Sequence, residues 1–202
     1  GWAKTGAVVP VLTYAGTEGG YMAITGAPVY WQRPVSAGLS IGMAANLRVI
    51  VHVETGGDSA SDTIAVRLAL SDTSSRSDVS IRFKRSVGNV EVYLYDNTNA
   101  AFIGSTIIIN AEVWVEVLYA QHRFSTTGVK HYLIARRYDR ATDPDWDGPY
   151  TTGTLTATTV GGAAGGSNSL RFGHVVSGDP ESWWKGVHLA RGRGGDRRCR
   201  RL

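Results

Sequence analysis

Residues 63–96 read TIAVRLALSDTSSRSDVSIRFKRSVGNVEVYLYD and carry the clearest evidence for the fold. Large apolar residues occupy every second position in three runs within this stretch, at residues 64–70, 79–83 and 90–94. This period of two is typical of β-strands that turn one face to a core and the other to water. Residues 71–77 and 88–89, which separate the runs, have the composition of turns. The stretch therefore predicts three strands joined by short turns.

The same alternation recurs on both sides of this stretch. Residues 47–53 and 113–119 alternate in the same way. Further strands are expected near residues 21–31, 101–109, 129–138, 150–158, 168–176 and 183–190, which makes about eleven strands in all. No long window shows the 3.6-residue apolar period of a helix. The sequence thus predicts an all-β fold in which two antiparallel sheets pack face to face as a sandwich.

The charges are distributed unevenly between the body of the chain and its end. The whole chain carries a net charge of +4, but residues 191–202 hold six arginines and one aspartate and are net +5, which leaves residues 1–190 at −1. We expect a single domain over residues 1–190 and a basic tail at 191–202. Within the domain, residues 1–20 are expected to join or flank the sandwich. Arginine pairs well with carboxylate and phosphate, so the tail is expected to contact an acidic partner. Nucleic acid is not expected as a partner except through this tail. The arginines concerned are Arg191, Arg193, Arg197, Arg198, Arg200 and Arg201.

Several classes of protein are excluded by what the sequence lacks. No apolar run approaches the ~18 residues of a membrane span. No basic segment followed by an apolar one stands at the start, so we expect no signal peptide. The single cysteine, Cys199, cannot form a disulfide within the chain. The glycine-rich residues 161–166 lack the Lys-Ser/Thr of a phosphate-binding loop.

Residues 143–148 have the pattern D-x-D-x-D-G, which begins a calcium-binding loop. Asp143, Asp145 and Asp147 would be the calcium ligands. The twelfth position is Thr154 instead of the bidentate glutamate, and the flanking segments alternate like strands. An acidic turn without an ion is the alternative that we favour, and no other cofactor is expected. The histidines are scattered over separate expected strands, which does not predict a zinc site: His52, His122, His131, His174 and His188.

A pair of glutamates raises the question of catalysis. Alternation puts Glu112, Trp114 and Glu116 on one strand face, with the two carboxylates about 13 Å apart by strand rise. Retaining glycosidases need their two carboxyl groups about 5–5.5 Å apart. We therefore interpret this as a solvated polar face and expect no catalytic residue and no enzyme activity.

Tryptophan is the remaining functional signal, because exposed indoles stack on the apolar faces of sugar rings and anchor protein interfaces. Trp183 and Trp184 are adjacent, so on a strand they point to opposite faces. Trp146 and Tyr150 lie in and just after the acidic segment. We expect Trp146, Tyr150, Trp183 and Trp184 to include the residues that contact a glycan or a protein partner.

Four segments resemble strands of concanavalin A-like (laminin-G-like) jelly rolls: GNVEVYLYD at 88–96, WVEVLY at 114–119, LRFGH at 170–174 and WWKGVHLA at 183–190. The resemblance extends over residues 20–190 and implies a jelly-roll sandwich. Laminin-G-like domains often bind calcium at their rim. Related hydrolases have an E-x-D-x-E motif, but here Trp114 stands at the place of its aspartate.

Concanavalin A-like jelly rolls include carbohydrate-binding modules, glycosidases and virion domains, so the function must be argued from the residues of a site. Lacking a signal peptide and disulfides, the chain is expected to be a non-catalytic structural or binding protein of a bacteriophage virion, in the tail or on the capsid surface. Its expected partners are other virion proteins and host-surface glycan. It would be assembled into the virion in the host cytoplasm and would then be extracellular. The alternatives are a free-standing carbohydrate-binding module or lectin, and a polysaccharide-cleaving enzyme.

Overall fold

The computed structural model describes residues 2–6, 11–15, 19–25, 29–35, 40–55, 64–72, 75–86, 88–109, 114–138, 152–163, 165–174 and 181–193. These residues form fourteen strands and no helix. The strands are β1 (Ala3–Thr5), β2 (Val11–Ala15), β3 (Gly19–Thr25), β4 (Val29–Pro34), β5 (Met43–Thr55), β6 (Ile64–Ser71), β7 (Arg76–Ser86), β8 (Asn89–Asp96), β9 (Ala101–Ile109), β10 (Val115–Arg123), β11 (Gly128–Arg137), β12 (Thr152–Val160), β13 (Ser169–His174) and β14 (Glu181–Arg193). Among the described residues, therefore, no helix is present that could cross a membrane.

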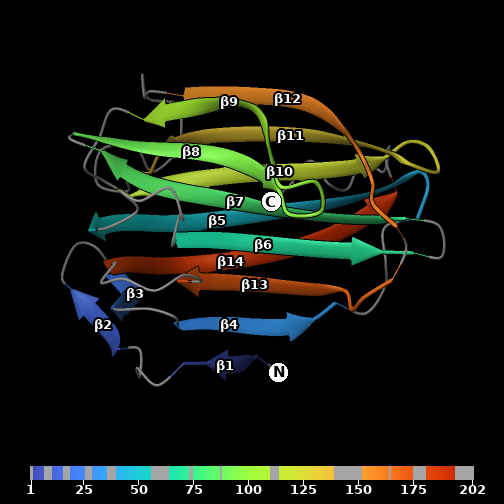
Figure 1. Ribbon diagram of the computed structural model, residues 1–202. Helices are drawn as coiled ribbons and strands as arrows, with labels where there is room; N and C mark the ends of the chain where they lie inside the picture. Colours follow the sequence, from blue (N-terminus) through green and yellow to red (C-terminus); the bar gives the residue numbers. More distant parts are fainter. Residues whose placement is uncertain are drawn as a thin grey trace.

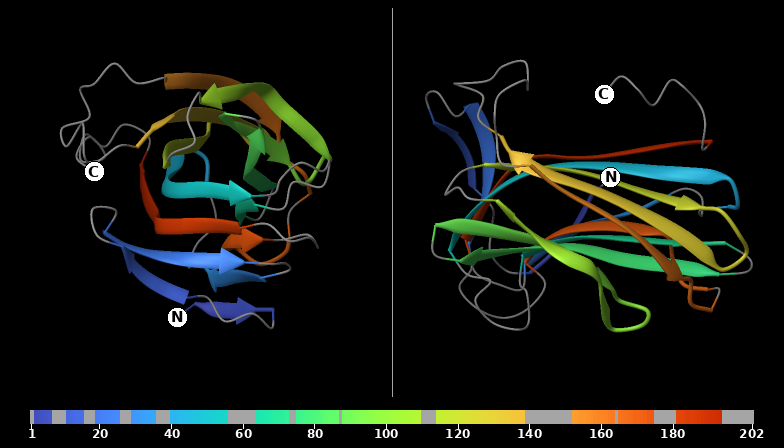
Figure 2. Two further views of the ribbon diagram at one scale, coloured as in Figure 1. Left: turned by 90° about the vertical axis from the view of Figure 1, so that its left-hand side faces the viewer. Right: turned by 90° about the horizontal axis from the view of Figure 1, so that it is seen from above.

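The strands form two antiparallel sheets that lie face to face (Figures 1 and 2). Sheet A has the strand order β1-β4-β13-β6-β7-β8-β9, and sheet B has the order β12-β11-β10-β5-β14-β3-β2. Strands close in sequence form hairpins, such as β7 with β8 and β10 with β11. The centre of sheet B, in contrast, joins β5 to β14, which are far apart in sequence. The predicted all-β sandwich is confirmed.

The core lies between the sheets and is made of the apolar residues that alternate along each strand. In sheet A, the apolar positions of β6, β7 and β8 point inward, as the period of two predicts. In sheet B, β5 and β10 supply the facing layer. These inward residues are Ile64, Val66, Leu68, Leu70, Val79, Ile81, Phe83, Val90, Val92, Leu94, Leu47, Val49, Val51, Val53, Val115, Val117 and Tyr119.

At one edge the two sheets come together, because β9 of sheet A packs against β12 of sheet B (Figure 1). Two glycines allow this close approach. A Cβ on Gly104, which has φ +69°, would stand 2.7 Å from Leu155 Cδ1, and a Cβ on Gly153 would clash with Ile107 Cγ2. Leu155 and Ile107 are thereby buried at the closed edge.

The number and the limits of the strands differ from the expectation at three places. The structure has fourteen strands among the described residues, whereas the sequence predicted eleven. The expected strand at 21–31 is two strands, β3 and β4. The short strands β1 and β2 were not predicted, because their sequences show no apolar alternation. β14 continues to Arg193, three residues past the predicted end of the domain at 190. Its last three residues pair with Met43, Ala44 and Ala45 of β5, so the predicted tail begins inside the sheet.

Candidate binding site on sheet B

The outer face of sheet B, turned away from the core, carries a buried carboxylate where the sequence predicted a solvated polar surface. The Glu116 side chain is only 1% exposed. Arg48 Nε donates to its Oε1 at 2.5 Å, and Arg136 Nε donates to its Oε2 at 2.9 Å. The prediction of a solvated face is wrong here because the neighbouring strands β5 and β11 each place an arginine beside Glu116 on this face.

This arrangement, which we call the Glu116 clamp, leaves the carboxylate no catalytic role. Both of its oxygens accept hydrogen bonds from guanidinium groups that remain protonated, so it is held as a buried acceptor. Glu112, the other glutamate of the pair, lies outside the described residues. Two further carboxylates of this face, Glu54 and Glu181, lie beside the rings of His52 and Trp183.

A layer of aromatic rings lies beside the clamp on the same outer face. The Trp183 ring stacks on His52, with ring centroids 4.6 Å apart, and on Tyr21 at 5.1 Å. Trp114 meets Tyr21 and His52 edge to face at 5.7 and 5.6 Å. Trp183, Trp114, His52 and Tyr21 make up what we call the aromatic layer. A bulge in β14 between Trp184 and Gly186 places Lys185 over Trp114, with Nζ 4.2 Å from the ring centroid.

Trp183 and Trp184 point to opposite faces of β14, as the sequence predicts, but only Trp183 lies on the outer face. Trp184 is 3% exposed and packs in the core against Phe172 and Phe83, with centroids 5.2 and 6.3 Å apart. Its indole N–H donates to Ser182 Oγ at 2.7 Å. The expectation that Trp184 contacts a partner is therefore corrected: its ring fills the sandwich interior.

The other sequence-predicted site residues lie outside the described residues. These are Trp146, Tyr150, Asp143, Asp145, Asp147 and, from the tail, Arg197, Arg198, Arg200 and Arg201. Arg191 and Arg193 are in β14. Within the described ranges, no three His, Cys, Asp or Glu side chains are grouped in a way that could hold a metal ion.

An open groove of about 490 Å³ lies along the outer face of sheet B, over β5, β10, β11 and β14. Alternate residues lead from Trp114, which directly precedes β10, past Glu116 to Leu118 in the groove. Tyr132 and Ile134 of β11 stand in its wall, 40% and 39% exposed. The full lining is Asn46, Leu47, Arg48, Leu118, Tyr119, Ala120, Tyr132, Ile134 and His188.

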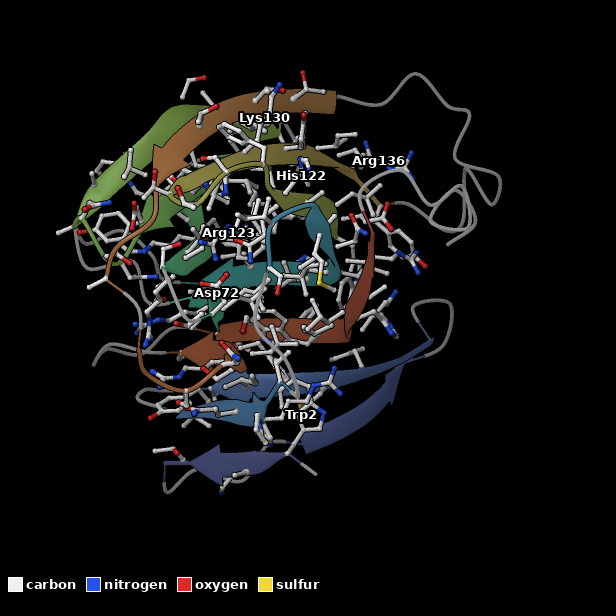
Figure 3. The ribbon with its side chains drawn as sticks, turned by 90° about the vertical axis from the view of Figure 1, so that its right-hand side faces the viewer. Trp2, Asp72, His122, Arg123, Lys130 and Arg136 are labelled. Atoms are coloured by element: carbon white, nitrogen blue, oxygen red, sulfur yellow. The ribbon has the colours of Figure 1, made fainter. Side chains whose placement is uncertain are left out.

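The groove has an apolar and a polar part. Leu118, Tyr132 and Ile134 supply the apolar surface, whereas Arg48 and His188, opposite each other across β5 and β14, supply polar groups. Sequence reasoning missed this site, although a signal was present: Tyr132 and Ile134 are large apolar residues at outward positions of β11. Figure 3 shows Arg136, His122 and Lys130 on strands of this sheet, and Arg123 and Asp72 between the two sheets.

A buried polar network crosses the interior at the end of the sandwich near Arg123. The Tyr119 hydroxyl lies 2.8 Å from His131 Nδ1, and His131 Nε2 lies 2.7 Å from Thr159 Oγ1. Burial lowers the pKa of His131 from its usual 6.5 to about 4, although the nearby Asp96 acts in the opposite direction. Burial also raises the pKa of Tyr119 well above its usual value. Tyr119 and His131 are therefore neutral near pH 7. Their contact joins β10 to β11 inside the sandwich, and the contact of His131 with Thr159 joins β11 to β12.

A second interior pair superficially resembles catalytic machinery. His174 Nε2 lies 2.7 Å from Ser182 Oγ. Both residues are fully buried, and the Ser182 oxygen also accepts from Trp184. A serine nucleophile must reach its substrate, so this pair stabilises the junction of β13 with the opposite sheet and performs no chemistry on a ligand.

Comparison with protein-family models found no match. Comparison with curated proteins also found none. Among solved structures, the chain is similar to the botulinum neurotoxin serotype G binding domain, at 10% identity and a TM-score of 0.46 over 94% of this chain. It is similar to the serotype D binding domain at 11% identity and a TM-score of 0.46 over 93% of this chain. The chain spans only 43% and 42% of the lengths of these two domains.

It is also similar to a β-1,3-glucanase from Mycobacterium marinum, at 12% identity and a TM-score of 0.35, covering 94% of this chain and 90% of the glucanase. At such identities and TM-scores, none of these likenesses assigns an activity to this chain.

Proposed function

We propose that this protein is a non-catalytic binding module that holds a glycan in the groove on the outer face of sheet B. The observation that carries the proposal is the exposure of Tyr132 and Ile134 in the wall of a groove of about 490 Å³. This volume falls within the ~300–1,000 Å³ of small-ligand sites. Sugar rings have one apolar face that stacks on an aromatic ring, and hydroxyl groups around their edge.

The polar lining suits those hydroxyl groups. Asn46 offers both a donor and an acceptor, and the exposed His188 offers ring nitrogens. Arg48 is fixed by its bond to Glu116, so the clamp supports one wall of the groove. A site supported by rigid strands binds with little loss of conformational entropy.

The clamp supports the non-catalytic part of this proposal. The only glutamate that the described strands place next to the groove is Glu116, and its two oxygens are occupied by arginines. Hydrolysis of a glycosidic bond needs one carboxyl group to donate a proton and a second to act as nucleophile or base.

The test is binding of the full chain to a glycan array, followed by calorimetry with the best ligand. We expect saturable binding that Tyr132→Ala weakens at least tenfold, about 1.4 kcal/mol. The matched control is Phe102→Ala, which removes an exposed aromatic ring from the other sheet. Equal affinities of the wild type and Tyr132→Ala, or no binding to any glycan, would refute the proposal.

The setting in a bacteriophage virion stays a prediction from the sequence resemblance. It is tested by whether the chain is recovered in purified phage particles by mass spectrometry. Recovery only as a free monomer that binds sugar would favour the free-standing carbohydrate-binding module instead.

A further inference from the structure

One end of sheet B, where β10 finishes and β11 begins, carries exposed apolar side chains (Figure 1). Ile41 is 52% exposed, Phe124 is 49% exposed and Val160 is 66% exposed. Ile41 precedes β5, Phe124 follows β10, and Val160 is the last residue of β12. We call these three residues the apolar rim. Apolar side chains that gather on a surface mark a place where another molecule binds.

Hydrogen bonds and strand register bring the three positions together. The backbone N–H of Gly42, next to Ile41, donates at 2.8 Å to the carbonyl of the residue before Phe124. Phe124 N donates to Gly128 O at 3.1 Å, and Gly128 pairs with Val160 across β11 and β12. The Phe124 ring lies over Gly128, because a Cβ on this glycine would clash with the ring. The apolar rim therefore extends from β5 across the β10–β11 hairpin to β12.

The charges beside the apolar rim are positive. The segments that build this end of the sheet contain no Asp or Glu in their sequences; they are residues 40–43, 122–130 and 158–163. His122 and Lys130 are opposite each other on β10 and β11, and Figure 3 looks at this end of the sandwich. Arg123 lies between the sheets and pairs with Asp72, so its charge is already balanced. No carboxylate of these segments would thus repel an anionic surface at the rim.

β14 brings the basic end of the chain to the same place. Its last residue, Arg193, pairs with Met43 of β5, two residues from Ile41. Residues 194–202 are attached to the sheet at that point, and their four arginines and one aspartate give them a net charge of +3. The apolar rim and a run of positive charge are therefore joined at one end of the sandwich.

We propose that the apolar rim docks this protein on a lipid surface that carries anionic headgroups. Proteins that bind at the surface of a bilayer bury apolar side chains among the headgroups and hold anionic lipid with Lys and Arg. Here the rim supplies the apolar side chains, and Lys130 together with residues 194–202 supplies the charge.

A protein partner fits the apolar rim less well. Each partner of a standard protein interface buries roughly 800 Å², and three half-exposed side chains at strand ends supply only a fraction of that area. A bilayer, in contrast, buries apolar side chains one at a time. The proposal goes beyond the glycan groove and is compatible with it, because Leu118 of the groove is six residues from Phe124, about 20 Å along the strand.

The test measures binding of the full chain to lipid vesicles by flotation at several salt concentrations. One set of vesicles is phosphatidylcholine alone, and the other is an equal mixture of phosphatidylcholine and phosphatidylserine. We expect the wild type to bind the mixed vesicles at least tenfold more tightly than the neutral ones. The variant Ile41→Ser/Phe124→Ser should raise the Kd for the mixed vesicles at least tenfold, because two apolar side chains no longer enter the headgroup region.

The matched control is Phe102→Ser/Ile108→Ser. It removes the same two residue types from β9 of sheet A, where both side chains are more than half exposed. We expect this control to change the Kd less than twofold. Equal losses in both variants would show unspecific apolar contact, and an unchanged Kd in the rim variant would show that charge alone binds the vesicles. Either result overturns the proposal, as does a wild type that does not bind the mixed vesicles.

A second measurement reports insertion directly and does not depend on a loss of binding. In a Cys199→Ser chain, a polarity-sensitive dye is attached to Phe124→Cys, or to Phe102→Cys as the control. Mixed vesicles should shift the emission of the dye at position 124 to shorter wavelength and leave the dye at position 102 unchanged. No shift at position 124, or equal shifts at both positions, would contradict the proposal.

Two further variants separate the contributions. A chain that ends after Arg193 should bind the mixed vesicles more weakly and with a smaller dependence on salt; an unchanged salt dependence would overturn the role given to residues 194–202. Tyr132→Ala should bind vesicles like the wild type, so failure of the groove proposal and failure of this one are distinguished.

Discussion

Acid should destabilise this protein through one buried histidine. His131 is fully buried on the inner face of β11, between the Tyr119 hydroxyl and Thr159. Burial lowers its pKa to about 4, with Asp96 acting in the opposite direction. The unfolded chain takes up this proton near pH 6.5, whereas the native protein does so only near pH 4. The stabilisation is therefore complete above pH 6.5 and is lost as the pH falls toward 4. The loss amounts to about 2 kcal/mol by pH 5 and about 3 kcal/mol by pH 4.

The assay is urea unfolding, followed by tryptophan fluorescence, of the wild type and His131→Gln between pH 7 and pH 4.5. The difference between the two free energies of unfolding isolates this histidine from other titrating groups. It should shrink by about 2 kcal/mol from pH 7 to pH 5. The control His122→Gln changes an imidazole on the outer face of β10, keeps His131 and should keep the acid-dependent loss. Parallel curves for the wild type and His131→Gln would refute the reasoning.

Three further predictions concern the core, the clamp and the chain end. Trp184→Ala should destabilise the protein by about 3–5 kcal/mol, because it empties a large buried site; a loss below about 1 kcal/mol in a urea melt would contradict the core placement. Glu116→Gln should cost about 1–3 kcal/mol in the same melt, a range kept low because the two clamp arginines are partly exposed, and an unchanged midpoint would show that the clamp contributes nothing. A chain ending after Arg193 should have the same melting temperature as the full chain but bind polyanions less tightly at low salt. A chain ending after Ala190 should have a lower melting temperature, because it loses the last residue pairs between β14 and β5. Identical melting temperatures of the two truncated chains would rule out a stabilising end of β14.

The sequence predicted the fold class well because alternation reports directly on burial in a two-sheet protein. The inward residues of β5 to β8 follow the period of two along their whole length. The short strands β1 and β2 could not be found in this way. With only three and five residues, β1 and β2 are too short to show an alternating pattern. They are strands because they pair with β4 and β3, which the sequence of each segment alone does not reveal.

The site was predicted less well, for a different reason. Glu116 follows the polar half of an alternating pattern, and only the partners across β5 and β11 decide that it is buried. Alternation separated Trp183 from Trp184, but it could not say which face was inside until the bulge and the pairing with β5 were known. The groove depends on Tyr132, Ile134 and His188, which come from two distant strands and share no motif.

The position of β14 has a consequence for how the protein is made. This strand, at residues 181–193, lies between β5 and β3 in the middle of sheet B. A ribosome exposes β5 long before β14, so the growing chain has an unpaired, apolar edge on β5 until β14 has been made. Contacts between such distant segments form slowly, and open strand edges of this kind pair readily with other chains. Successful production should therefore depend on chaperones that cover β5, or on slow translation at low temperature, until β14 is released and inserts.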